Sequence, residues 1–262
     1  MDLGLEDSVS VILASSGGLG KAAASSLARE GANVIINGRS EEKLEEARKD
    51  IASIATGDVS TYQGDITDKT VPKGMVQRAI SKYGRLDHLV TSAGGPPRMR
   101  FSEATDEDWY DGYELLVMPV VRSIREASPH LQDEGGAIVT ITSGLTKEAS
   151  PHNVLSSSVR MAVMGLQKMM SIELAPEIRT NAIMPGGHET PRVFETFDKL
   201  IEEGEIDDYD EGKALRAEDH PIGRLGKPEE FGDTVAYLCS ERAGNIDGVA
   251  LHHDGGKHKS TF

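Results

Sequence analysis

The sequence contains a single cysteine, Cys239, among 262 residues. One thiol cannot form a disulfide within the chain, so an internal disulfide is excluded. Cys239 lies in a late stretch whose apolar residues recur at helical spacing. We therefore expect it to pack in the core rather than to act as a reactive thiol.

Long apolar runs are also absent, and none approaches the length that spans a membrane. The acidic start, Met1 to Asp7, lacks the basic-then-apolar order of a signal peptide. These absences predict a cytoplasmic protein without a membrane partner. At 28.2 kDa the chain fits one α/β domain over residues 1–262, which would bury roughly 70–75% of its unfolded surface.

Basic residues are scarce relative to acidic ones. The chain has 28 Lys and Arg and 43 Asp and Glu, which gives a formal charge of −15. This balance disfavours phosphate backbones and anionic membranes, so nucleic acid is not expected as a partner. Such a surface suits either an ordinary acidic protein or one adapted to high salt. A melting temperature that rises toward molar KCl would indicate the second.

The first chemical signal is a strand, a glycine-rich turn, a helix and a second strand between Val9 and Arg39. Residues 9–13 and 33–37 are short apolar runs typical of buried parallel strands, and residues 21–30 favour a helix. Glycines in the turn let the backbone approach a diphosphate, which the helix N-terminus attracts. Glycines alone would indicate only a tight turn, but their place between strand and helix favours nucleotide binding. The candidate diphosphate contacts are Ser15, Ser16, Gly18, Leu19 and Gly20.

The end of the second strand indicates the cofactor. NAD sites usually offer an acid there to the ribose 2′-hydroxyl, whereas this chain has Asn37, Gly38, Arg39 and Ser40. A guanidinium makes paired, charge-assisted bonds to phosphate. Arg39 with Ser40 therefore predicts NADP(H) in preference to NAD(H).

The rest of the chain continues the alternation of helices and strands, which predicts a parallel sheet with ligands at the carboxyl ends of its strands. Pro119 should kink the helix it crosses or shift its start. Residues 187–221 are charged and poor in core residues, so we expect a substrate lid there. We expect strands around 61–63, 88–91, 137–142, 179–184 and 249–251, and helices over 41–54, 69–82, 106–131, 154–175 and 228–240.

Taken together, these stretches resemble the short-chain dehydrogenase/reductase family over nearly the whole chain, and its 3-oxoacyl-(acyl-carrier-protein) reductase branch in particular. The matching pieces, in order, are Gly18-Leu19-Gly20, Gly64-Asp65, Ala93-Gly94, Trp109, Thr142-Ser143, Pro185-Gly186 with Thr190, Pro228-Glu229-Glu230 and Asp254-Gly255-Gly256. The resemblance implies a three-layer Rossmann fold of about seven parallel strands.

The resemblance also implies cofactor contacts. Asp65, with Ile66 beside it, would meet the adenine, and Ala93 and Gly94 would lie along the nucleotide. Thr190 would hold the carboxamide, within a loop that also contains Pro185, Gly186 and His188.

Family members catalyse with Asn, Ser, Tyr and Lys, and only one of these four is present here. Aligning Val163 to Leu166 with the family's stretch after Tyr-x-x-x-Lys puts Ser156 at the Tyr position and Arg160 at the Lys position. Ser143 matches the family's Ser, and Leu116 stands where the Asn belongs. The first glycine of the turn is Ala14.

The replacements change the chemistry. A phenol near a cation suits general acid–base work, whereas an aliphatic hydroxyl is far more basic, and a guanidinium is a permanent cation that does not pass protons. Ser143, Ser156 and Arg160 are the candidate catalytic residues, with Arg160 also on the ribose. His152, His188 and Tyr113 are candidate substitute acids, or otherwise loop and packing residues.

Two functions stay open from the residues. The first is an NADP(H)-dependent oxidoreductase acting on a carbonyl or alcohol, and the second is an NADP(H)-binding sensor or assembly subunit with little turnover. Nothing points specifically to non-redox chemistry or to a metal site.

Arg192 would meet an acidic substrate or pair with lid carboxylates. The methionine-rich helix over 154–175 predicts a homo-oligomer, as a dimer or tetramer.

Overall fold

The computed structural model describes residues 1–260 and contains one sheet of seven parallel strands in the order β3-β2-β1-β4-β5-β6-β7. This is the α/β Rossmann-type fold that the sequence predicted. Runs of Val, Ile and Leu form the central strands, which are buried on both faces. The strands are β1 Val9–Ile12, β2 Asn33–Gly38, β3 Val59–Gln63, β4 His88–Thr91, β5 Gly136–Ile141, β6 Ile178–Pro185 and β7 Ala250–His253.

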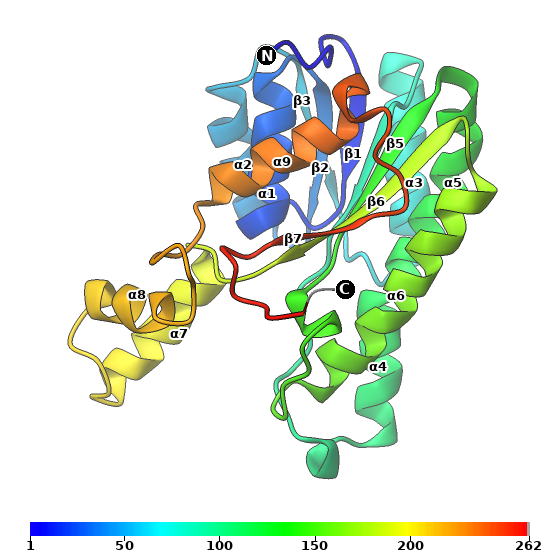
Figure 1. The fold of residues 1–262 in the computed structure, drawn as a ribbon. Helices are drawn as coiled ribbons and strands as arrows, with labels where there is room; N and C mark the ends of the chain where they lie inside the picture. Colours follow the sequence, from blue (N-terminus) through cyan, green and yellow to red (C-terminus); the bar gives the residue numbers. More distant parts are fainter. Residues whose placement is uncertain (261–262) are drawn as a thin grey trace.

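Helices cover both faces of this sheet, which gives three layers (Figure 1). One apolar core lies under α1, α2 and α9, and a second lies under α3, α5 and α6. Cys239 is buried on α9, and burial raises the pKa of its thiol to about 12, as expected of a packing residue. The helices are α1 Gly18–Arg29, α2 Glu41–Ala52, α3 Thr70–Tyr83, α4 Asp106–Leu116, α5 Met118–Glu134, α6 Val154–Glu173, α7 Pro191–Glu202, α8 Tyr209–Ala217 and α9 Pro228–Cys239.

The strand order reverses beside β1. Val11 pairs with Ile35 of β2 on one side and with Leu89 of β4 on the other. Chain connections leave in opposite directions from these two neighbours, so a crevice opens at the carboxyl ends of β1 and β4. This topology places the glycine-rich turn and the loops after β4 and β5 around one site.

The predicted helix over 106–131 is two helices, α4 and α5, which meet at Val117. Pro119 lies in the first turn of α5, where its missing N–H leaves no helical hydrogen bond unmade. Pro119 therefore shifts a helix start, which was one of the two expected outcomes.

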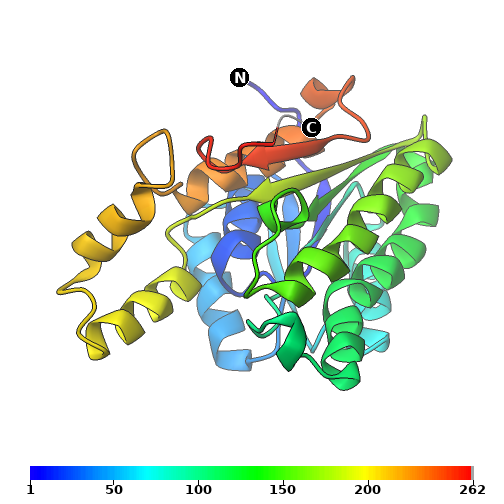
Figure 2. The ribbon, with the colours of Figure 1, turned by 60° about the horizontal axis from the view of Figure 1, so that its bottom comes forward.

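The predicted lid has its own structure. Helices α7 and α8 extend away from the carboxyl ends of the strands, as both views show (Figures 1 and 2). A small apolar cluster joins Phe197 of α7 to Ile206, between the two helices, and to Leu225, after α8. The segment is thus less poor in core residues than its composition suggested. Among the described residues, no helix is long and apolar enough to cross a membrane.

Candidate active site

The glycine-rich turn joins β1 to α1, and the helix starts within it at Gly18. Gly18 has a φ of 56°, and Ala14 has a φ of 46°, a left-handed conformation that a glycine adopts without strain. The Ala14 N–H donates to Oδ1 of Asn37, whose side-chain amide in turn donates to the carbonyls of Tyr62 and Gly64. Asn37 therefore fixes the turn although the family's first glycine is missing.

Gly20 is the residue of this turn whose backbone packs closely against another part of the turn, at Ala14. A Cβ added there would lie 2.5 Å from the Ala14 carbonyl oxygen, so no side chain fits without moving the backbone. Gly17 has no atom within 4 Å of such a Cβ. The N-terminal N–H groups of α1 are thus presented to the cleft at the point where a diphosphate is expected.

Ser15 differs from the other predicted diphosphate contacts. It is fully buried, its Oγ donates to the Ile12 carbonyl, and the same oxygen accepts from the Asn37 N–H. Ser15 does not line the cleft, whereas the remaining predicted cofactor residues do. Those residues are Ser16, Gly18, Leu19, Gly20, Arg39, Ser40, Asp65, Ile66, Ala93, Gly94, Arg160, Pro185, Gly186, His188 and Thr190.

Arg39 lines the cleft directly after β2 with 82% of its side chain exposed, and its Nη1 is 3.7 Å from Oδ2 of Asp65. Hydrogen bonds from Thr67 lower the pKa of Asp65, and the charge of Arg39 adds to this. Ser40 caps α2 by accepting from the Lys43 N–H. The guanidinium is held only loosely by protein groups, which leaves it available to a 2′-phosphate.

Ser143, Ser156 and Arg160 all line the same cleft. Ser143 follows β5, and its Oγ accepts a hydrogen bond from the Leu145 N–H at 3.2 Å. Ser156 and Arg160 are buried one turn apart on α6. The three candidate catalytic residues chosen by sequence alignment therefore all lie on the wall of one cleft.

Arg160 is a buried cation with few partners. Its Nη2 donates to the Gly94 carbonyl at 3.4 Å, while its Nε is buried without a partner among the described residues. Burial, with the nearby charge of Arg192, lowers the pKa of Arg160 to about 10. The side chain is still a cation at neutral pH. Its orphan donor fits a nearby acceptor such as a ribose hydroxyl.

The candidate substitute acids are less well placed. Tyr113 and His152 do not line the cleft, and Nε2 of His152 lies 3.2 Å from Nη2 of Arg100. His188 does line it, but its Nε2 meets Nδ1 of His253 and its Nδ1 meets the Gly186 carbonyl. Burial lowers the pKa of His188 to about 4, so the ring is neutral at pH 7.

Leu116 is 2% exposed in the core under α5 and α6, away from the cleft.

The C-terminal segment supplies a residue that sequence reasoning missed. His258 lines the cleft, its ring lies against Gly144, and its Nδ1 is 2.5 Å from Oδ2 of Asp254. With His252 these two form the one group within residues 1–260 whose ligand atoms lie close enough, within 4.8 Å, to hold a metal ion. The repeated histidines around Asp254 were the available signal.

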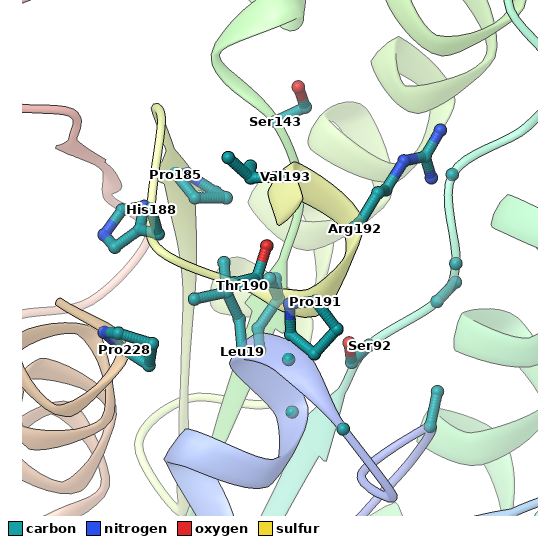
Figure 3. A pocket seen from close by; sticks show the side chains of 18 of the residues that line it. Leu19, Ser92, Ser143, Pro185, His188, Thr190, Pro191, Arg192, Val193 and Pro228 are labelled. Carbon is teal, nitrogen blue, oxygen red and sulfur yellow. The ribbon is translucent and has the colours of Figure 1, made fainter. Parts of the chain in front are cut away.

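The cleft has a volume of about 2040 Å³, roughly twice that of the largest sites for drug-sized ligands. Figure 3 shows Leu19, Ser143, Thr190 and Arg192 around it, contributed by α1, the β5 loop and the lid. Two further arginines line it, Arg98 after β4 and Arg216 on α8. The space suits a dinucleotide with a small substrate beside it.

Comparisons with known proteins extend over nearly the whole chain. A family model described as enoyl-(acyl carrier protein) reductase matches residues 13–258. The 3-oxoacyl-(acyl-carrier-protein) reductase of Thermotoga maritima is 30% identical over 254 residues, which cover 96% of this chain and 98% of that protein.

Two solved structures are similar throughout. L-sorbose reductase from Gluconobacter frateurii, complexed with NADPH and L-sorbose, is 32% identical with a TM-score of 0.94, covering 99% of this chain and 100% of that one. A short-chain oxidoreductase from Pseudomonas aeruginosa PAO1, described as containing an atypical catalytic center, is 28% identical with a TM-score of 0.91, covering 100% of both.

Proposed function

Because this chain belongs to the short-chain dehydrogenase/reductase family and is an NADP-dependent oxidoreductase of carbonyl and alcohol groups, we propose that Ser143 and Arg160 form its reaction centre. The main support for this proposal is that all predicted cofactor contacts except Ser15 line one cleft with Ser143, Ser156 and Arg160. The nucleotide would extend from Arg39, past the turn at Gly18 and Gly20, to the loop at Thr190. NADP(H), when bound, supplies or accepts the hydride.

The protein's own groups would act on the substrate oxygen. In reduction, the Ser143 hydroxyl donates a hydrogen bond to the carbonyl, and the Arg160 cation stabilises the alkoxide that hydride addition creates. The proton that completes the alcohol would come from water, because Ser156 is too weak an acid and His188 is neutral with both ring nitrogens engaged. Oxidation follows the same steps in reverse.

A second candidate is an NADP(H)-binding sensor or assembly subunit with little turnover. It is favoured by the absence of a phenol and an amine at Ser156 and Arg160, and by the burial of Leu116 outside the cleft. The two candidates share the cofactor site and differ in whether Ser143 acts on a substrate.

Replacing Ser143 with alanine tests the reaction centre. We expect kcat/KM for NADPH-dependent reduction, in a panel of ketones and acyl thioesters, to fall by about 10²-fold, because the carbonyl loses its hydrogen-bond donor. The dissociation constant for NADPH should not change. Ser157→Ala is the matched control, since its hydroxyl is buried on α6 and does not line the cleft.

Equal activity of Ser143→Ala and the wild type would contradict the proposed centre. NADPH binding by a wild type that reduces no member of the panel would favour the sensor instead. In either case the cofactor titration is read separately from turnover.

We also propose a homo-oligomer in the cytoplasm. Large apolar side chains are exposed on α4 and α6, namely Tyr110, Tyr113, Met161, Met169 and Ile172, with Ile172 66% and Met169 56% exposed. Exposed apolar groups gathered on neighbouring helices are typical of a contact between subunits. Light scattering at moderate salt should give the mass of a dimer or tetramer, and a monomer mass would rule the contact out. Cell fractionation tests the proposed cytoplasmic location.

A further inference from the structure

Three arginines from three separate elements line the cleft. Arg98 follows β4, Arg192 is in the first turn of α7, and Arg216 is near the end of α8. Within residues 1–260, none of them forms an ion pair with a carboxylate. Arg122 and Arg224, in contrast, pair with Glu114 and Glu230.

Arg192 extends from the lid toward the loop that follows Ser92 (Figure 3). Its guanidinium lies across Gly95, so closely that a Cβ on that glycine would overlap it. Arg192 is also near enough to Arg160 for its charge to help lower the Arg160 pKa. Arg192 therefore adds a second cation beside the proposed reaction centre and is not paired with lid carboxylates.

Arg216 and Arg98 form a second set of like charges. The guanidinium of Arg216 lies over the Phe197 ring, 5.6 Å from its centroid, which fixes it on the lid. Burial lowers the pKa of Arg216, and the charge of Arg98 lowers it further. Two cations that line the same cleft, one on the lid and one after β4, therefore repel each other.

Among the described residues, no carboxylate that lines the same cleft lies within ion-pair distance of these arginines. Asp219 pairs with Lys257, and Glu148 accepts from the Lys259 N–H. Glu195 and Glu218 form no ion pair with any of the three arginines. Like charges kept together around a cleft cost free energy, which a bound anion recovers.

The phosphates of NADP(H) are expected elsewhere, at the turn of α1 and at Arg39. We propose that the substrate of the reaction centre carries an anionic group, a carboxylate or a phosphate, which Arg98, Arg192 and Arg216 bind as the lid covers it. This inference rests on the proposed function and names the substrate class of the same site. Planar guanidiniums suit both anions because each accepts two parallel hydrogen bonds.

The test is calorimetric titration of the NADPH-saturated protein with malonate and, separately, with inorganic phosphate, at constant ionic strength. We expect saturable binding to the wild type, weakened about tenfold in Arg192→Gln and in Arg216→Gln, since each loses one charge-assisted contact. Arg78→Gln is the control, because Arg78 is an exposed arginine of α3 that does not line the cleft. It removes the same charge and should bind as the wild type does.

The anion that binds more tightly identifies carboxylate or phosphate as the recognised group. Failure of both anions to bind the wild type, or equal binding by Arg192→Gln and Arg216→Gln, would overturn the inference. So would a tenfold loss of NADPH affinity in Arg192→Gln, which would assign that arginine to the cofactor. NADPH binding is measured before the anion is added, so a failure of the cofactor site is recognised on its own.

Discussion

Replacing Arg39 with aspartate is expected to weaken NADPH binding by about 10²-fold and to reverse the preference toward NADH. The guanidinium lines the cleft directly after β2, where the 2′-phosphate is expected, and an aspartate there would add to the charge of Asp65. A carboxylate at this position instead accepts a hydrogen bond from the 2′-hydroxyl of NADH. Calorimetric titration of the variant and the wild type with both cofactors measures the change.

The substitution should leave the fold intact, since 82% of the Arg39 side chain is exposed. Arg48→Asp is the matched control, because Arg48 is on α2, pairs with Glu45 and does not line the cleft. It carries the same change of charge and should keep the preference for NADPH. An Arg39→Asp variant that still binds NADPH more tightly than NADH would contradict the assignment of the 2′-phosphate to this residue.

Installing a phenol and an amine, as Ser156→Tyr with Arg160→Lys, should raise the rate of carbonyl reduction by about 10²–10³-fold. Ser156 lines the cleft, so a phenol at this position can extend into open space. A lysine one turn later would lower the phenol's pKa and so make it a proton donor near neutral pH. Steady-state rates over the panel of ketones and acyl thioesters measure the gain.

Leu116→Asn is best left out of this variant, because Leu116 is 2% exposed and an amide would be buried in the apolar core. The control is Ser156→Phe with Arg160→Lys, which keeps the ring and removes only the hydroxyl. A gain in both variants would show that packing, and not proton donation, is responsible. No gain in either would indicate that the natural site already has an efficient proton donor.

Local patterns in the sequence were enough to predict the sheet and the cofactor half. Val11 to Leu13 and Val34 to Ile36 are apolar because central parallel strands are buried on both faces. The glycine turn is recognisable because a Cβ at Gly20 would meet the Ala14 carbonyl. Such constraints act between near neighbours in the chain, so the spacing of residues records them.

The substrate side was less predictable because its residues come from distant segments. His258 lies against Gly144, 114 positions earlier, and nothing in either segment alone indicates this contact. Phe197, Ile206 and Leu225 form a small core, but they are separated in the sequence by charged residues. The composition of the lid therefore predicted fewer core residues than the structure has. The burial of Ser15 had a similar cause, since the hydrogen bond that its Oγ accepts from the Asn37 N–H depends on the pairing of β1 with β2.

The central claim is a cleft shaped for a phosphorylated dinucleotide beside a centre without the usual phenol and amine. Calorimetric titration of the wild-type protein with NADPH and with NADH tests it most directly, because it needs no substrate. We predict saturable NADPH binding in the micromolar range and NADH binding at least about tenfold weaker. Equal or tighter binding of NADH, or no binding of NADPH at millimolar concentration, would contradict the account.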